Sequence, residues 1–229
     1  MRTMVHRTGQ QSLVKKLLRI SRGNMVAVIV ITVCACFLLV ALLAGWQIGP
    51  REQISVAVVQ GGGGVGSGFV VSSDYLVTSS RVVTGSDNTE LLFGDGRTWS
   101  GKVVLNEPET DIALVSITGM ANIPTPMILG NSDGVAEKAL VAALGYVDGK
   151  YAVTEGTVSE VTTGYIKTDV TFTPGNLGGP LILKDTGEVI GMVFFPANMG
   201  EEQVEELRYS ISSNALLSIC SERGFELVR

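Results

Sequence analysis

Short hydrophobic runs alternate with turn-forming residues through most of the chain. Runs of four to eight residues that are rich in β-branched side chains and bounded by Gly, Asp or Asn are typical of β-strands. The runs lie at 54–59, 67–72, 75–79, 89–93, 101–105, 111–117, 139–146, 151–161, 165–170, 179–183 and 188–195. The pattern predicts an all-β domain, either a sandwich or a pair of barrels, with the extended segment 122–130 joining its two halves.

The segments between the runs predict how the strands are connected. Residues 94–96, 148–149 and 185–187 have the composition of hairpin turns. The four glycines at 61–64 lack the Lys-Ser/Thr ending of a phosphate loop, so a flexible strand connection is expected there. Only the end of the chain has a helical pattern, with Ser212 or Ser213 as the cap of a short helix over 214–223.

Residues 25–46 form a run of 22 residues without a charge. As a helix this run is roughly 33 Å long, enough for the hydrocarbon core of a bilayer. It indicates a transmembrane signal anchor, followed by a tether at 47–53. A cleaved signal peptide is the alternative, although the run is longer than the apolar region of such peptides.

The distribution of charge sets the expected orientation. Residues 1–24 contain six cations and no acid, so we expect them to be a cytoplasmic tail, with residues 47 onward outside the membrane. The chain has 17 Lys and Arg against 22 Asp and Glu; without those six cations, 11 remain, and the outer part carries −11. This balance argues against nucleic acid as a partner.

Histidine and cysteine usage excludes several kinds of chemistry. His6 is the single histidine among 229 residues and precedes the apolar run. The outer domain therefore has no imidazole for a Ser-His-Asp or Cys-His site or for a histidine-ligated metal, and we expect neither a metal nor a cofactor. Cys220 is the one cysteine beyond the apolar run, so a disulfide within the domain is excluded. Its apolar neighbours favour a buried, inert thiol over pairing between chains.

Three motifs occur in the order and spacing of a trypsin-like protease. They are GSGFVVSSDYLVTSSRVV at 66–83, TDIALVSI at 110–117 and TDVTFTPGNLGGPLI at 168–182. Together they resemble the HtrA (Deg) family of envelope serine proteases over about 54–220. The resemblance implies two six-stranded antiparallel barrels of the chymotrypsin type, about 54–121 and 122–229. HtrA proteins usually continue into a PDZ domain, which we do not expect in a chain ending at Arg229.

The resemblance places Arg81 where the family has its general-base histidine and Leu177 where it has its nucleophilic serine. Only Asp111 matches its catalytic counterpart. Arginine stays protonated at neutral pH and leucine has no nucleophilic atom. From this we expect a pseudoprotease that is not an enzyme. Residual hydrolysis by an unrelated arrangement is the rival expectation.

The remaining site residues follow from the same resemblance. Arg81 and Asp111 are expected to form an ion pair within about 4 Å, with an anion-binding Arg81 as the alternative. Gly175, Asn176 and Leu177 would form a vestigial oxyanion loop, which either binds a carbonyl or carboxylate or is collapsed; we favour collapse. A possible peptide groove is formed by Phe194, Phe195 and Pro196.

These features predict a membrane-anchored, inactive HtrA-like protein that binds other proteins. The expected role is an accessory or structural subunit of a membrane complex, with membrane or envelope proteins as partners and residues 25–46 as the membrane contact. The alternative is a regulator or sensor that binds envelope peptides or an active protease.

Overall fold

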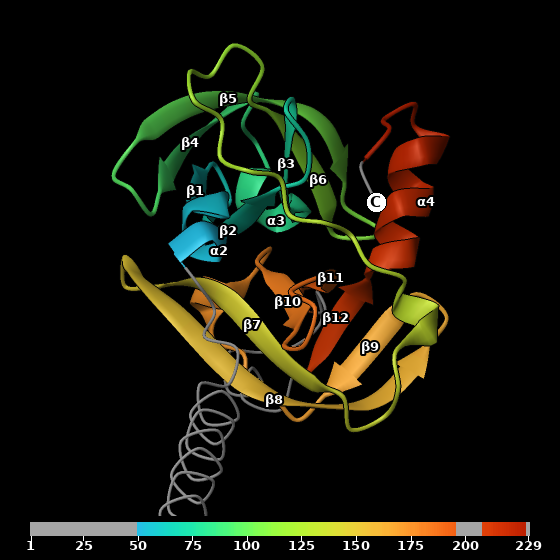
Figure 1. The fold of residues 1–229 in the computed structure, drawn as a ribbon. Helices are drawn as coiled ribbons and strands as arrows, with labels where there is room; N and C mark the ends of the chain where they lie inside the picture. Colours follow the sequence, from blue (N-terminus) through green and yellow to red (C-terminus); the bar gives the residue numbers. More distant parts are fainter. Residues whose placement is uncertain (1–49, 196–207, 228–229) are drawn as a thin grey trace, which may run out of the picture. The chain divides into compact units, whose positions relative to one another are not determined.

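The computed structural model describes residues 50–195 and 208–227 (Figure 1). The chain divides into residues 1–47 and 48–229, and the described residues belong to the second unit. Within them no helix is long and apolar enough to cross a bilayer. The predicted cytoplasmic tail and transmembrane segment at 1–46, as well as Pro196, lie outside the described residues.

Six antiparallel strands close the first barrel. They are β1 (Val56–Gly61), β2 (Gly64–Val70), β3 (Tyr75–Ser79), β4 (Asn88–Phe93), β5 (Thr98–Glu107) and β6 (Ile112–Ser116). Around the barrel their order is β1-β2-β3-β6-β5-β4. In β4 every second side chain is buried, because successive side chains of a strand point to opposite faces of the sheet.

A second closed barrel contains the other six strands. They are β7 (Leu140–Val147), β8 (Lys150–Thr162), β9 (Tyr165–Thr168), β10 (Pro180–Leu183), β11 (Val189–Val193) and β12 (Tyr209–Ser212). The order around this barrel is β10-β11-β12-β9-β8-β7. The β7–β8 turn has positive φ at both Asp148 and Gly149, the backbone that a two-residue hairpin requires. The expected pair of six-stranded barrels is confirmed.

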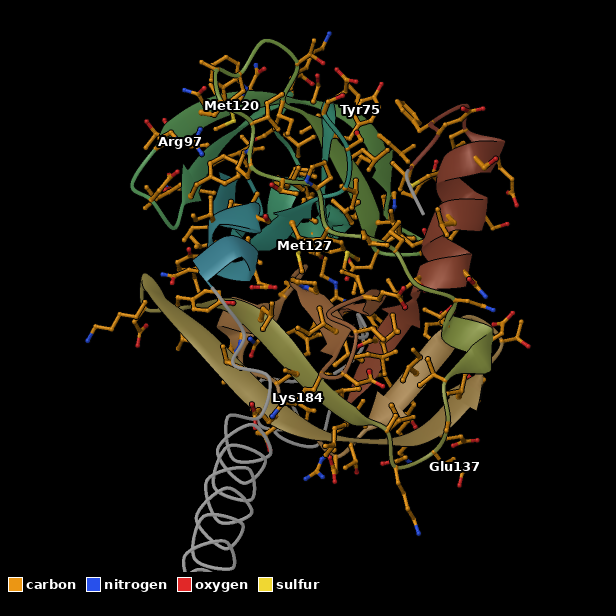
Figure 2. All side chains as sticks on the ribbon, viewed as in Figure 1. Tyr75, Arg97, Met120, Met127, Glu137 and Lys184 are labelled. Atoms are coloured by element: carbon orange, nitrogen blue, oxygen red, sulfur yellow. The ribbon has the colours of Figure 1, made fainter. Side chains whose placement is uncertain are left out.

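A buried cluster joins the two barrels. It combines residues of the first barrel, such as Phe69, with residues of the second, such as Leu144. Met127, from the connection between the barrels, belongs to it and lies between them in Figure 2. Ser67 adds a polar link: its hydroxyl donates to the Gly175 carbonyl (2.6 Å) and accepts from the Tyr146 backbone N–H (2.9 Å). The space between the barrels is therefore filled by packed side chains.

The C-terminal helix also connects the two halves. Helix α4 (Ser213–Glu222) is capped by Ser212, whose hydroxyl accepts from the Ala215 N–H, as the sequence predicts. After it, the Arg223 guanidinium pairs with the Glu107 carboxylate of β5 at 2.8 Å.

Four local features differ from the sequence-based expectations. Residues 50–55 form helix α2 (Pro50–Ser55), so the expected tether is helical from its fourth residue onward. A one-turn helix, α3 (Ser80–Val83), follows β3, and strand β12 was not expected. The glycine segment 61–64 is an ordered hairpin turn between β1 and β2.

Candidate functional site

Arg81 is held on the short helix α3 by contacts to its backbone. The Ser79 hydroxyl caps the helix by accepting from the Arg81 N–H at 3.2 Å. From the glycine turn, the Gly63 N–H donates to the Val82 carbonyl at 3.1 Å. A Cβ atom on Gly63 would lie 1.7 Å from the Arg81 carbonyl oxygen. Only glycine allows the turn to come this close to α3. The turn is therefore held against the helix by the Gly63–Val82 hydrogen bond.

Asp111 is buried at the start of β6, beside α3. Its backbone is in the left-handed region (φ 56°), which Asp tolerates better than most residues. Its Oδ1 accepts from the Ser79 hydroxyl at 2.6 Å and from the Arg81 backbone N–H at 3.2 Å. Its Oδ2 is buried and has no hydrogen-bond partner among the described residues. The carboxylate is thus held mainly by a hydroxyl and a backbone amide.

The expected ion pair between Arg81 and Asp111 is present at its outer limit. Arg81 Nε lies 3.9 Å from Asp111 Oδ1, which is an ion pair but too long for a hydrogen bond. The two side chains differ in exposure, at 37% for Arg81 and 8% for Asp111. Water therefore screens much of the attraction at the Arg81 end.

Burial raises the pKa of the Asp111 carboxyl above its ordinary value of 3.8. The hydrogen bonds from Ser79 and from the Arg81 N–H, and the Arg81 charge, oppose this effect without cancelling it. The net direction shows that desolvation outweighs the stabilisation of the charged form.

The N–H groups of Asn176 and Leu177 donate to carbonyl groups of the same loop. Residues Pro174–Asn176 form a 3₁₀ turn, in which the Asn176 N–H donates to the Thr173 carbonyl and the Leu177 N–H donates to the Pro174 carbonyl. The buried Asn176 side chain accepts from the Thr173 N–H and hydroxyl, both at 2.9 Å. In this geometry the amides of Asn176 and Leu177 are occupied by the loop itself, as in the collapsed arrangement we favoured. A role for Gly175, Asn176 and Leu177 as a former oxyanion loop stays a prediction.

Leu177 packs between the barrels. Its partly buried side chain contacts the hydrophobic clusters of both. A Cβ on Gly66 of β2 would meet both the Val82 side chain and the Leu177 carbonyl oxygen. The structure therefore brings Arg81 and Asp111 into contact and places the backbone of Leu177 and the Val82 side chain of α3 close to Gly66.

The residues of the expected peptide groove have different environments. Phe195 is buried in the core of the second barrel. Phe194 is partly exposed, and its ring packs on that of Tyr165, with 5.4 Å between the ring centroids. Phe194 and Phe195 form no backbone–backbone hydrogen bond with another described residue. Two residues without regular secondary structure therefore follow β11, beside an aromatic pair.

Two further groups bear on the chemistry expected from the sequence. Cys220 is buried, and burial raises the pKa of its thiol to about 12, which keeps it protonated and unreactive. Among residues 50–195 and 208–227, no three His, Cys, Asp or Glu side chains gather as a metal site.

Sequence reasoning missed Ser79, which makes the shortest hydrogen bond to Asp111. A signal was present: Ser79 directly precedes the four residues of α3, in the position of a helix cap, but the helix is too short to show a periodic pattern.

The family profile of the trypsin-like peptidase domain matches residues 66–192, more than half of the chain. This chain belongs to the trypsin-like peptidase family. Among curated relatives, the probable periplasmic serine endoprotease DegP-like of Halomonas elongata is 38% identical over 138 residues. Serine protease HTRA1 of Xenopus tropicalis is 35% identical over 141 residues. Each match covers 56% of this chain but only 28% and 30% of the respective relative.

Solved structures give the same family assignment. The HtrA-type protease AlgW with tripeptide superposes with a TM-score of 0.63 at 28% identity, covering 77% of this chain and 63% of AlgW. AlgW with decapeptide gives a TM-score of 0.64 at 24% identity, covering 76% and 66%. The predicted HtrA resemblance is confirmed, and the periplasmic relatives agree with an envelope location.

These names contradict the expectation that the chain is not an enzyme. The relatives are named serine proteases, the structural neighbours are named HtrA-type proteases, and none of these names indicates a loss of catalysis. That expectation came from the side chains of Arg81 and Leu177 in this chain. The chemistry of these two side chains does not place the chain outside a family of named serine proteases.

Proposed function

We propose that residues 48–229 form a protein-binding domain of the cell envelope and act as an accessory or structural subunit of a membrane complex. The observation that carries the proposal is that the backbone of Phe194 and Phe195, beside the Phe194–Tyr165 ring pair, forms no backbone–backbone hydrogen bond within residues 50–195 and 208–227. A strand edge with free N–H and C=O groups accepts an extended peptide by β-augmentation, and apolar side chains next to it add affinity. Such binding requires neither a nucleophile nor a general base.

The related structures support a peptide as the ligand. AlgW, at 28% identity, was solved with a tripeptide, and so was its variant AlgWS227A. Both share the double-barrel fold of this chain. The same peptide complexes favour a second candidate role, in which the domain senses free envelope peptides.

Photocrosslinking from the ring pair tests where binding occurs. Tyr165 is 44% exposed, so replacing it with p-azidophenylalanine keeps the ring and introduces a reactive group. Leu92 of β4, 42% exposed on the first barrel, is the matched control position. We expect crosslinks to other polypeptides from position 165 and far fewer from position 92. Equal crosslinking from both positions would contradict binding beside Phe194.

Membrane anchoring is the second part of the proposal. Six cations before the apolar run 25–46 support an anchor with the N-terminus in the cytoplasm and the domain outside. Protease added outside the cytoplasmic membrane should therefore digest residues 47–229 and spare the tail, in a chain that keeps its N-terminus. A mature chain that begins near Gly45 would instead identify a cleaved signal peptide.

A further inference from the structure

The guanidinium of Arg81 has donors that the protein itself does not use. Arginine carries five side-chain N–H donors, and none of those of Arg81 has a hydrogen-bond acceptor among residues 50–195 and 208–227. Among these residues the guanidinium forms one ion pair, in which Arg81 Nε lies 3.9 Å from Asp111 Oδ1. The side chain is also 37% exposed, so a ligand can reach it.

Asp111 does not accept a hydrogen bond from the Arg81 guanidinium. Its Oδ1 already accepts from the Ser79 hydroxyl and from the Arg81 backbone N–H. The carboxylate is thereby held against the backbone of α3, whereas the Arg81 side chain remains partly exposed. Asp111 therefore compensates part of the positive charge but leaves the planar fork of donors open.

The backbone at Arg81 is held in place by hydrogen bonds, so the start of its side chain has a fixed position. The Arg81 N–H is held by Ser79 and Asp111, and the following carbonyl, of Val82, is held by the Gly63 N–H. The Ser80 hydroxyl bonds to the Asn106 side chain, and the Thr84 hydroxyl bonds to the Ser80 carbonyl. A ligand therefore has to order only the side chain of Arg81.

We propose that Arg81 binds a carboxylate of the peptide partner. This inference rests on the proposed peptide-binding function and names the chemical group that the site selects. A carboxylate has two oxygens in one plane and matches the arginine fork in a bidentate pair. The outer part of the chain carries −11, so selection of an anion has to come from this local donor set rather than from the overall field. The carboxylate is either the C-terminus of the partner or an Asp or Glu side chain.

Two pools of random hexapeptides test the inference with the full-length chain in detergent micelles. The pools differ only in their C-termini, which are free in one and amidated in the other. Bound peptides are recovered and sequenced, and their affinities are measured by fluorescence anisotropy. Enrichment of the free-carboxylate pool identifies a terminal carboxylate, whereas enrichment of Asp or Glu in both pools identifies a side-chain carboxylate.

Substitutions then assign the effect to Arg81. We expect Arg81→Gln to weaken carboxylate peptides about tenfold and leave neutral amidated peptides unchanged, as for one charge-assisted bidentate contact. Arg81→Lys, which keeps the charge and loses the fork, should give a smaller loss. Lys102→Gln is the charge-matched control, because Lys102 is exposed and forms no ion pair within residues 50–195 and 208–227. It should have no effect. Near-ultraviolet circular dichroism verifies that each variant is folded.

The failures of the two proposals are distinguishable. Peptides that bind without any preference for a carboxylate, or equally to wild type and Arg81→Gln, would overturn the role of Arg81 and leave peptide binding intact. If no peptide from either pool binds, the proposed function fails, and the carboxylate site fails with it.

Discussion

Asp111 and Arg81 share a contact, but their energetic roles differ. Asp111→Ala removes a buried carboxylate together with two hydrogen bonds, from the Ser79 hydroxyl and the Arg81 N–H. Arg81→Ala removes a half-exposed guanidinium whose nearest approach to the carboxylate is 3.9 Å. We therefore expect the Asp111 substitution to cost more stability than the Arg81 substitution.

A double-mutant cycle on this pair measures their direct coupling. A screened pair at this distance should give about 0.2–1 kcal/mol, in the range of exposed ion pairs. From the sequence alone a buried pair was expected, for which removing one partner costs about 3–5 kcal/mol. Urea unfolding of the wild type, the two single variants and the double variant gives the coupling. A value above about 2 kcal/mol would show that the guanidinium closes onto the carboxylate in solution.

The raised pKa of Asp111 gives a pH dependence with a definite sign. Folded protein keeps this proton at pH values at which the unfolded chain, with an ordinary pKa of 3.8, has lost it. The contribution to stability is therefore complete below pH 3.8 and is lost as the pH rises through the raised pKa of the folded state.

Asp111→Asn isolates this contribution because asparagine does not titrate there. The free energy of unfolding of the wild type minus that of Asp111→Asn should fall as the pH rises above 3.8, the ordinary value from which the folded-state pKa is raised. A difference that rises with pH would mean that hydrogen bonds and the Arg81 charge outweigh burial.

Among the elements, the glycine turn between β1 and β2 has the most direct link to the site. Gly63→Ala would place a Cβ 1.7 Å from the Arg81 carbonyl oxygen, so either the turn or α3 has to move. We expect a loss of about 1–3 kcal/mol, as for other forced overpacking.

Gly134→Ala is the matched control for this substitution. Its Cβ would meet only the Asn131 side chain, at 3.8 Å, an ordinary van der Waals contact. Thermal unfolding of the two variants should separate them by several degrees. If both variants melt together, the close approach of Gly63 to α3 does not hold in solution.

Elements with a local signal were predictable from the sequence. The Asp148-Gly149 turn encodes its structure locally, because Asp and Gly tolerate the positive φ that a two-residue hairpin requires. The turn at 61–64 was not predictable, since its order comes from α3, about 20 residues later in the chain. Strand β12 pairs with β9 and β11, and such non-local pairing leaves little signal in four residues.

The candidate site was predictable in its residues but not in its geometry. The resemblance to the HtrA family placed Arg81 and Asp111 together, and the structure confirms the contact. It did not indicate that Ser79 and a backbone amide hold the carboxylate while the guanidinium stays partly exposed. Side-chain direction depends on the three-dimensional surroundings of α3, which no local pattern in the sequence records.

For the whole molecule, fold and family are settled more firmly than activity. The trypsin-like peptidase profile matches residues 66–192, and the structure has the two closed barrels of that fold. The curated relatives are much longer, and this chain corresponds to 28–30% of their length. What those proteins do as a whole therefore bears on this chain only through the shared domain.

The central claim is that the chain binds other proteins as part of a membrane complex. Native mass spectrometry of the full-length chain, purified from its own membranes in mild detergent, tests this most directly. The claim predicts a species heavier than the 24.2 kDa chain by a second polypeptide at a fixed ratio. Release of that polypeptide by a hexapeptide that competes for the Phe194–Tyr165 surface would place the contact there. A chain found only at 24.2 kDa, or only in multiples of that mass, would contradict the claim.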